Sequence, residues 1–215
     1  MIFSAVPNLN GKLISLKKKI MKKSFIILFL IFAVNFWKAQ NLDSTALIII
    51  DIQNFYFPGG ASALVEPEKA AEQAKVLLNY FRENKGLVVH VKHDFNPGGE
   101  IHDLVKPFDN EKVFTKKEVN AFLNTGLNDY LKQNSIKYVT LCGLQTHMCL
   151  EAGTRAAHDF GYDCTVVEDA CSTRDLKFAD VTVKASDVHY STLASLKSYA
   201  KVLTLNEFFE SQNKK

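Results

Sequence analysis

The stretch KYVTLCGLQTHMCLEAGTRAAHDFGYDCTVVED, residues 137–169, predicts a strand, a helix and a second strand in succession. Residues 137–143 form an apolar run that is typical of a buried strand. The amphipathic segment 146–160 predicts a helix, and Gly161 suits the position just after its end. The apolar run 164–169 predicts the second strand. This order of elements is typical of a parallel sheet that is covered by helices.

The chain from residue 46 onward repeats this alternation of apolar runs and amphipathic segments. Further strands are expected at 46–51, 87–91, 113–115 and 201–205, and further helices at 67–84, 126–133 and 188–199. The segment 93–110 is rich in Gly, Pro and Asp and is expected to be a long loop. Five or six strands with intervening helices predict a three-layer α/β/α sandwich with a mostly parallel, doubly wound (Rossmann-like) sheet.

The first forty residues predict a leader (signal peptide) for export. From Met21 the sequence has a basic start, an apolar run over 25–37 and a short polar exit. The apolar run of about 13 residues is shorter than the roughly 20 that span a bilayer, so no stable membrane anchor is expected after removal of the leader. Cleavage near Ala39 or Gln40 would give a periplasmic or secreted protein. The sequence leaves open whether translation starts at Met1 or at Met21.

Residues 41–215 are expected to form one mildly acidic domain. Seven of the 26 Lys and Arg residues and none of the 23 Asp and Glu residues lie in the first forty positions, which leaves 19 basic and 23 acidic residues in the domain. Nucleic acid needs a basic face that contacts its phosphates. This charge balance therefore argues against nucleic acid as a partner.

All four cysteines lie in this domain, at Cys142, Cys149, Cys164 and Cys171. An even number in an exported chain permits disulfide bonds, although a domain of this size does not need them and the spacing matches no metal site. Cys164 with Cys171 is the one pair considered for a disulfide, and the sequence leaves it open. Cys149 is expected to be free.

Three kinds of side chain that suit nucleophilic catalysis fall where predicted strands end. Asp51 closes one strand, Cys149 lies near the start of the helix after another, and Lys116 and Lys117 follow a third. The start of a helix lowers the pKa of a thiol, and a nearby carboxylate can accept its proton. A buried ammonium would stabilise both anions, but charge alone does not show which lysine turns inward. The alternative is structural, because free cysteines are more often small buried apolar residues.

Three blocks of sequence carry a resemblance to a known family. They are ALIIIDIQNFYF (46–57), VFTKKEVNAF (113–122) and YVTLCGLQTHMCLEAGTRAAHDFGYDCTVVEDACST (138–173). Together and in this order they resemble the isochorismatase-like cysteine hydrolases, which include nicotinamidases, N-carbamoylsarcosine amidohydrolases and ureidoacrylate amidohydrolases. The resemblance covers residues 45–205.

The resemblance implies a catalytic triad of Asp51, Lys116 and Cys149, and the spacing of the lysine six residues before Phe122 selects Lys116 over Lys117. The implied reaction is hydrolysis of a C–N bond in a small amide, ureide or carbamoyl substrate through a thioester on the cysteine. Two alternatives stay open, an isochorismatase-type vinyl ether hydrolase and a catalytically silent binding module of the same fold. The presence of the cysteine and of the whole triad counts against them.

The resemblance also implies a non-proline cis peptide between Leu144 and Gln145, with backbone amides near Gln145 and Cys149 holding an oxyanion. The residues expected to line the substrate pocket are Gln53, Phe57, His93 and Phe122.

No metal and no other cofactor is expected. Nicotinamidases of this family bind a divalent metal through a DxH-type segment, and here the region reads VKHDFNPGGEIHDL (91–104). His93, Asp94 and His102 are present, but their spacing departs from the family pattern, which argues against nicotinamide as the substrate. Members of this family often assemble as dimers or tetramers through exposed helices, so a homo-oligomer of this kind is expected. The expected partner is a small-molecule substrate.

Overall fold

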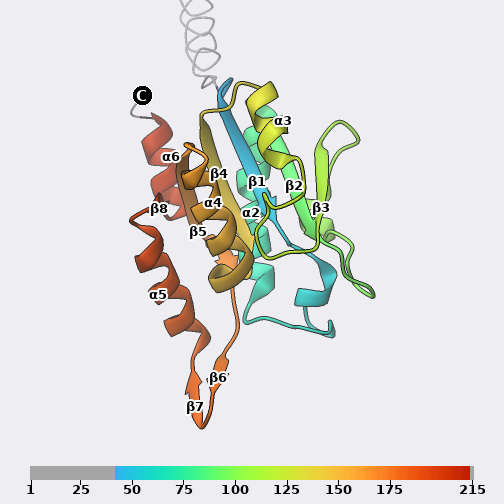
Figure 1. Cartoon of the computed structure of the whole chain (residues 1–215), viewed down its shortest axis with the longest axis vertical. Coiled ribbons are helices and arrows are strands. Elements are labelled where there is room, and N and C mark those ends of the chain that lie inside the picture. Colours follow the sequence, from blue (N-terminus) through green and yellow to red (C-terminus); the bar gives the residue numbers. More distant parts are fainter. Residues whose placement is uncertain (1–41, 214–215) are drawn as a thin grey trace, which may run out of the picture. The chain divides into compact units, whose positions relative to one another are not determined.

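The computed structural model describes residues 42–213 (Figure 1). The expected leader and its cleavage site lie outside these residues, so export stays a prediction. Among the helices of the described part of the chain, none is both long enough and apolar enough to cross a membrane.

A six-stranded sheet forms the centre of the domain. Its strands are β1 (Thr45–Ile50), β2 (Leu87–His93), β3 (Lys112–Lys116), β4 (Tyr138–Leu144), β5 (Asp163–Ser172) and β8 (Ala200–Leu203). Their order is β3-β2-β1-β4-β5-β8, and every neighbouring pair is parallel. The chain runs outward from β1 to β3 and then returns to β4 on the other side of β1. This doubly wound order confirms the predicted fold class and places the carboxyl ends of β1 and β4 side by side at the reversal.

Helices cover both faces of this sheet (Figure 1). They are α2 (Pro67–Glu83), α3 (Leu127–Gln133), α4 (Glu151–Asp159), α5 (Ala185–Leu196) and α6 (Leu205–Asn213). On one face α5 packs against α4, where Arg155 donates a hydrogen bond to Ser195. On the other face α6 packs against α2, where Phe208 contacts Tyr80 and Phe81. The sheet and the helices on its two faces form the three layers of the predicted α/β/α sandwich.

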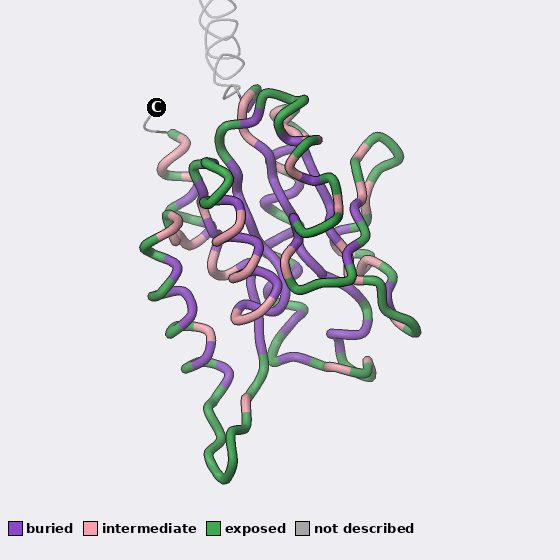
Figure 2. The backbone as a smooth tube through the Cα atoms, in the orientation of Figure 1, coloured by how far each residue is buried: buried purple, intermediate pink, exposed green. Residues whose placement is uncertain are grey.

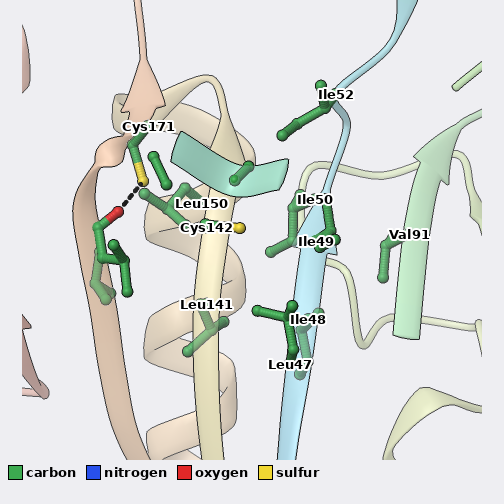
Figure 3. Packing of buried hydrophobic residues seen from close by; sticks show 14 of the residues in the cluster. Leu47, Ile48, Ile49, Ile50, Ile52, Val91, Leu141, Cys142, Leu150 and Cys171 are labelled. Atoms are coloured by element: carbon green, nitrogen blue, oxygen red, sulfur yellow. Dashed lines mark hydrogen bonds between the residues drawn. The ribbon is translucent and has the colours of Figure 1, made fainter. Parts of the chain in front are cut away.

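The hydrophobic core centres on β1, because helices cover both of its faces. Its last five residues, 46–50, are all buried, as expected for a strand inside a parallel sheet. Figure 3 shows the side chains of residues 47–50 between Val91 of β2 and Leu141 of β4, and Figure 2 shows that buried residues follow the central strands. The apolar residues of α2 that recur at helical spacing in the sequence are all buried in the structure. They are Ala70, Ala74, Leu77, Leu78 and Phe81.

Four elements near the carboxyl half differ from the sequence prediction. The strand expected at 164–169 spans Asp163–Ser172, and the helix expected at 188–199 spans Ala185–Leu196. The helix expected over 146–160 begins as a π turn, η3 (Thr146–Leu150), and becomes α-helical only from Glu151. The strand expected over 201–205 ends at Leu203, and Leu205 instead begins α6. Leu205 is buried in α6, so its apolar character reflects a helix face and does not continue the strand.

The connections carry short elements that the sequence did not indicate. The 3₁₀ turns are η1 (Asn54–Tyr56) and η2 (Asp103–Val105). The second lies in the long connection between β2 and β3, which the sequence predicted as a loop. A two-stranded antiparallel hairpin of β6 (Leu176–Phe178) and β7 (Val181–Val183) projects between β5 and α5 (Figure 1). Strands of three residues are too short to show an alternating pattern in the sequence.

The four cysteines are free thiols. Cys164 and Cys171 both lie on β5, opposite Val139 and Gly143 of β4. These two partners on β4 are four residues apart, which spans roughly 13 Å of strand, whereas a disulfide needs Cα atoms within about 7 Å of each other. The bridge that the sequence left open is therefore absent.

Gly143 lies where β4 meets β1, and the backbone there leaves no room for a side chain. Its φ is +130°, and a Cβ at this position would lie 1.9 Å from the carbonyl oxygen of Ile50. Ile50 immediately precedes Asp51, so this close approach fixes the strand end that carries the candidate acid.

Gly143→Ala is expected to lower the free energy of unfolding by roughly 3 kcal/mol or more, because it combines an unfavourable φ with a clash against backbone. Gly126→Ala is the matched control: its φ is +78° but a Cβ meets nothing within 4 Å, so a loss of about 1 to 2 kcal/mol is expected. Urea unfolding followed by circular dichroism measures both. Equal losses would contradict the steric argument.

Candidate active site

The carboxyl edge of the sheet brings Asp51, Lys116 and Cys149 together. Asp51 follows β1 in a left-handed conformation with φ 52°, Lys116 is the last residue of β3, and Cys149 lies in the π turn after β4. Their exposed fractions are 0%, 1% and 4%. Parallel strands place their carboxyl ends at one edge of a sheet, which is why residues far apart in the sequence meet here.

The Lys116 ammonium is the centre of this cluster. Its Nζ lies 2.7 Å from Oδ2 of Asp51, 3.2 Å from Sγ of Cys149 and 3.2 Å from Nδ1 of His93. An ammonium has three N–H donors and no acceptor, so each donor has one partner. His93 must accept at Nδ1, and a neutral His93 then carries its proton on Nε2. Lys117, the neighbour that charge alone did not exclude, is exposed.

Gln53 fixes the position of His93. Its side-chain oxygen accepts from the backbone N–H of His93 at 2.7 Å, and its amide nitrogen donates to the carbonyl oxygens of His93 at 2.9 Å and Gly99 at 2.6 Å. Gln53 is fully buried. The expected pocket residue therefore ties the end of β2 to the loop after it, and its amide groups bind backbone.

Burial raises the pKa of Asp51, while the charge of Lys116 and hydrogen bonds from Lys116 and the Cys149 thiol act in the opposite direction. Burial is the larger effect because it removes the carboxylate from water. A carboxyl group with a raised pKa is a stronger base when ionised, which suits a group that takes up a proton near neutral pH.

The expectation that the pKa of Cys149 is lowered was wrong. Burial and the negative charge of Asp51 raise the pKa of the thiol to about 12, although Lys116 opposes them. The helix start does not lower the pKa of this thiol, because the cysteine lies inside a tight π turn and is almost fully buried. The resting group is a neutral thiol, so nucleophilic attack requires proton transfer to a neighbour.

The turn before Cys149 has unusual backbone. The peptide bond between Leu144 and Gln145 is cis, at the position that the resemblance implies. The carbonyl oxygen of Gln145 accepts hydrogen bonds from the amides of Met148 at 3.1 Å and Leu150 at 3.3 Å. The side-chain nitrogen of Gln145 donates to the Tyr56 hydroxyl at 3.3 Å.

Tyr56 is a neighbour of the site that the sequence analysis did not select. It lies in η1, six residues from β1, and is buried. Burial raises the pKa of Tyr56, and the hydrogen bond from Gln145 acts in the opposite direction. Its position in the block 46–57 was the one available signal.

Two of the expected pocket residues pack against other rings. Phe57 stacks on His102 with centroids 3.7 Å apart. Phe122 contacts Phe160 and Tyr162 at centroid distances of 5.5 Å and 6.4 Å. Both phenylalanines are buried. These contacts make them part of the core around the site, and contact with a substrate stays a prediction.

The remaining histidines have partners other than Cys149. His147, two residues before the cysteine, bonds Thr173 through Nδ1 at 2.6 Å, and His90 bonds Glu111 at 3.0 Å. Within residues 42–213 no group of three or more His, Cys, Asp or Glu side chains is arranged to hold a metal ion.

The Isochorismatase domain model matches residues 45–207. The chain therefore belongs to the isochorismatase family, and it is an isochorismatase-family hydrolase by sequence and fold.

Individual relatives agree with this assignment. The chain is 44% identical over 179 residues to YddQ of Bacillus subtilis (strain 168), an uncharacterized isochorismatase family protein, covering 78% of this chain and 99% of YddQ. It is 32% identical over 143 residues to streptothricin hydrolase of Streptomyces noursei, covering 62% of this chain and 51% of that protein. A crystal structure of a protein described as an isochorismatase hydrolase, from Oleispira antarctica, is 41% identical with a TM-score of 0.75, covering 77% and 96% of the two chains.

Lys116→Met is expected to lower the free energy of unfolding by about 3 kcal/mol at pH 7, because it leaves the Asp51 carboxylate buried without its ion pair. The same change raises the pKa of Asp51 further. The deficit is therefore largest above that pKa and shrinks as the pH falls and the carboxyl group takes up a proton. Urea unfolding at pH 7 and pH 5 measures it.

Lys117→Met is the matched control, since this side chain is exposed and its loss is expected to change stability by less than about 0.5 kcal/mol. A deficit in Lys116→Met that is the same at both pH values would contradict the role of Asp51.

Proposed function

We propose that this protein is a cysteine hydrolase that cleaves a C–N bond of a small amide, ureide or carbamoyl substrate through a thioester on Cys149. One observation carries the proposal: a buried ammonium, Lys116, contacts both a carboxylate and a thiol. A carboxylate that can accept a proton and a cation that can stabilise the resulting thiolate are what a neutral thiol needs to become a nucleophile.

In the first step the sulfur of Cys149 attacks the substrate carbonyl carbon and its proton passes to Asp51. A C–S bond forms, and the carbonyl electron pair moves to oxygen. Lys116 stays protonated and offsets the negative charge that develops on sulfur. Backbone amides near Gln145 and Cys149 would donate to the oxyanion.

In the second step the intermediate collapses and the C–N bond breaks. The proton held by Asp51 passes to the leaving nitrogen, and the acyl group stays on Cys149 as a thioester. Water then attacks this thioester while Asp51 accepts a proton from the water. The C–S bond breaks, and the thiol is restored when that proton returns to sulfur.

The small-molecule substrate class follows from the resemblance and from the relatives. Streptothricin hydrolase, by its name, hydrolyses streptothricin, and its similarity supports a hydrolytic reaction. An isochorismatase-type vinyl ether hydrolase or a silent binding module of this fold remains the alternative. The contacts of Lys116 favour the cysteine hydrolase, because neither alternative needs a thiol beside an ammonium.

Cys149→Ala is expected to reduce kcat/KM on a panel of small amides, ureides and carbamoyl compounds by roughly 10³-fold or more, because it removes the nucleophile. Cys164→Ala is the control, since Cys164 is a buried thiol on β5 that bonds backbone carbonyls, and it is expected to retain activity within a few-fold. Intact mass spectrometry of the parent with a slow substrate is expected to show an acyl adduct that Cys149→Ala lacks.

Undiminished turnover by Cys149→Ala would remove the proposed nucleophile. A parent protein that hydrolyses no member of the panel, and that forms no adduct, would favour the binding module.

We also propose that the chain forms a dimer or tetramer through the β6–β7 hairpin. Strand pairing puts Phe178 opposite Val181 and Leu176 opposite Val183, so four apolar side chains share one face. Phe178 and Val181 are 84% and 61% exposed, and the hairpin is the exposed projection in Figure 2.

A second copy of the same chain is the occupant that this face fits. Two copies that pack these faces together would bury on the order of 600 Å² of apolar side chain, which suits the central part of an interface of standard size. Identical faces also pack naturally about a two-fold axis. The resemblance had placed assembly on exposed helices, whereas the proposed contact uses the hairpin.

The double variant Phe178→Ser, Val181→Ser is expected to lower the mass measured by light scattering toward that of one chain, because it removes the apolar centre of the contact. Lys177→Ser changes the opposite face of the same hairpin and is expected to leave the mass unchanged. A monomeric parent, or a double variant with the mass of the parent, would contradict the proposal.

A further inference from the structure

Three polar side chains in contact with one another lie beside the turn that carries Cys149. His189 bonds the hydroxyl of Thr146 through Nδ1 at 2.9 Å, and its Nε2 lies 3.5 Å from Oε2 of Glu168. Thr146 is fully buried. The triad of Asp51, Lys116 and Cys149 does not use any of these three groups, and the resemblance assigns them no role.

The three residues come from three different elements. Glu168 lies on β5, His189 lies on α5, and Thr146 is the first residue of the π turn. Thr146 also directly follows the cis peptide bond between Leu144 and Gln145. The contacts of these three side chains therefore join a strand and a helix to the segment that connects the cis peptide to the cysteine.

The chemistry of the groups fixes the direction of the hydrogen bonds. An ionised carboxylate can only accept, so a neutral His189 donates its Nε2–H toward Glu168. Its Nδ1 then carries no proton and accepts from the Thr146 hydroxyl. Burial lowers the pKa of His189, which favours this neutral form, although Glu168 opposes it.

We propose that His189 is a positioning residue for the hydrolysis, acting through Thr146 to hold the π turn and hence the sulfur and the oxyanion amides in place. The inference rests on the proposed function for its kinetic consequence. His189 bonds Thr146 and has no contact of its own with Asp51, Lys116 or Cys149 among the hydrogen bonds and ion pairs of the described residues. Small displacements of a catalytic group lower turnover strongly.

His189→Ala is expected to lower kcat on the panel substrates by about 10 to 100-fold with little change in KM, because the loss falls on alignment in the reacting complex. His189→Asn keeps a polar group near the position of Nδ1 and is expected to recover activity to within a few-fold of the parent. His158→Ala, an exposed histidine of α4, is the control and is expected to be unchanged.

Thr146→Val tests the same contact from the other side, since it removes the hydroxyl and keeps the shape. It is expected to lower kcat by a similar factor, and the double variant Thr146→Val, His189→Ala is expected to be no worse than either single variant, because the two residues act through one bond. Additive losses would overturn the proposal.

Hydrogen exchange of the peptide that spans residues 144–150 gives a readout that needs no substrate. Exchange there is expected to be faster in His189→Ala than in the parent, and near the parent rate in His189→Asn. If hydrolysis depends on Cys149 but His189→Ala keeps both kcat and slow exchange, the positioning role is wrong while the proposed function stands. If the parent hydrolyses nothing, the proposed function falls and the exchange rates alone decide the contact's role.

Discussion

The buried ion pair between Lys116 and Asp51 is the interaction on which the candidate site depends. Both side chains are almost fully removed from water, and an isolated charge in that position would be strongly unfavourable. Each charge is tolerated because the other lies 2.7 Å away. The remaining two ammonium donors go to Cys149 and His93, so the pair also determines where the thiol and the imidazole lie.

The sheet topology brings these groups together. Parallel β1, β2 and β3 place Asp51 and Lys116 at one edge of the sheet, and the reversal of winding puts the carboxyl end of β4, which leads to Cys149, next to that of β1. Gly143 lets the two strands approach closely at that point, and Gln53 ties the end of β2 to the following loop. Asp51, Lys116 and Cys149 thus belong to strand ends and a tight turn. A reaction that depends on alignment requires its groups to be held in this way.

The same burial that orders the site keeps its thiol protonated. A pKa near 12 for Cys149 means that the sulfur becomes nucleophilic only as its proton moves to Asp51, whose own pKa is raised. Proton transfer and attack are therefore linked in the proposed mechanism. The turn that holds the sulfur then matters as much as the ionised groups, and the contact of Thr146 with His189 lies at that turn.

The sequence by itself determined the strands and the covering helices, since apolar runs such as 46–51 and the helical spacing of α2 depend only on local pattern. It also placed Asp51 and Cys149 at strand ends, while the choice of Lys116 required the family resemblance. The π turn, α6, the β6–β7 hairpin and the raised pKa of Cys149 were decided by tertiary structure alone. Each depends on which distant groups pack together and on how much water they exclude, and a linear pattern carries neither quantity.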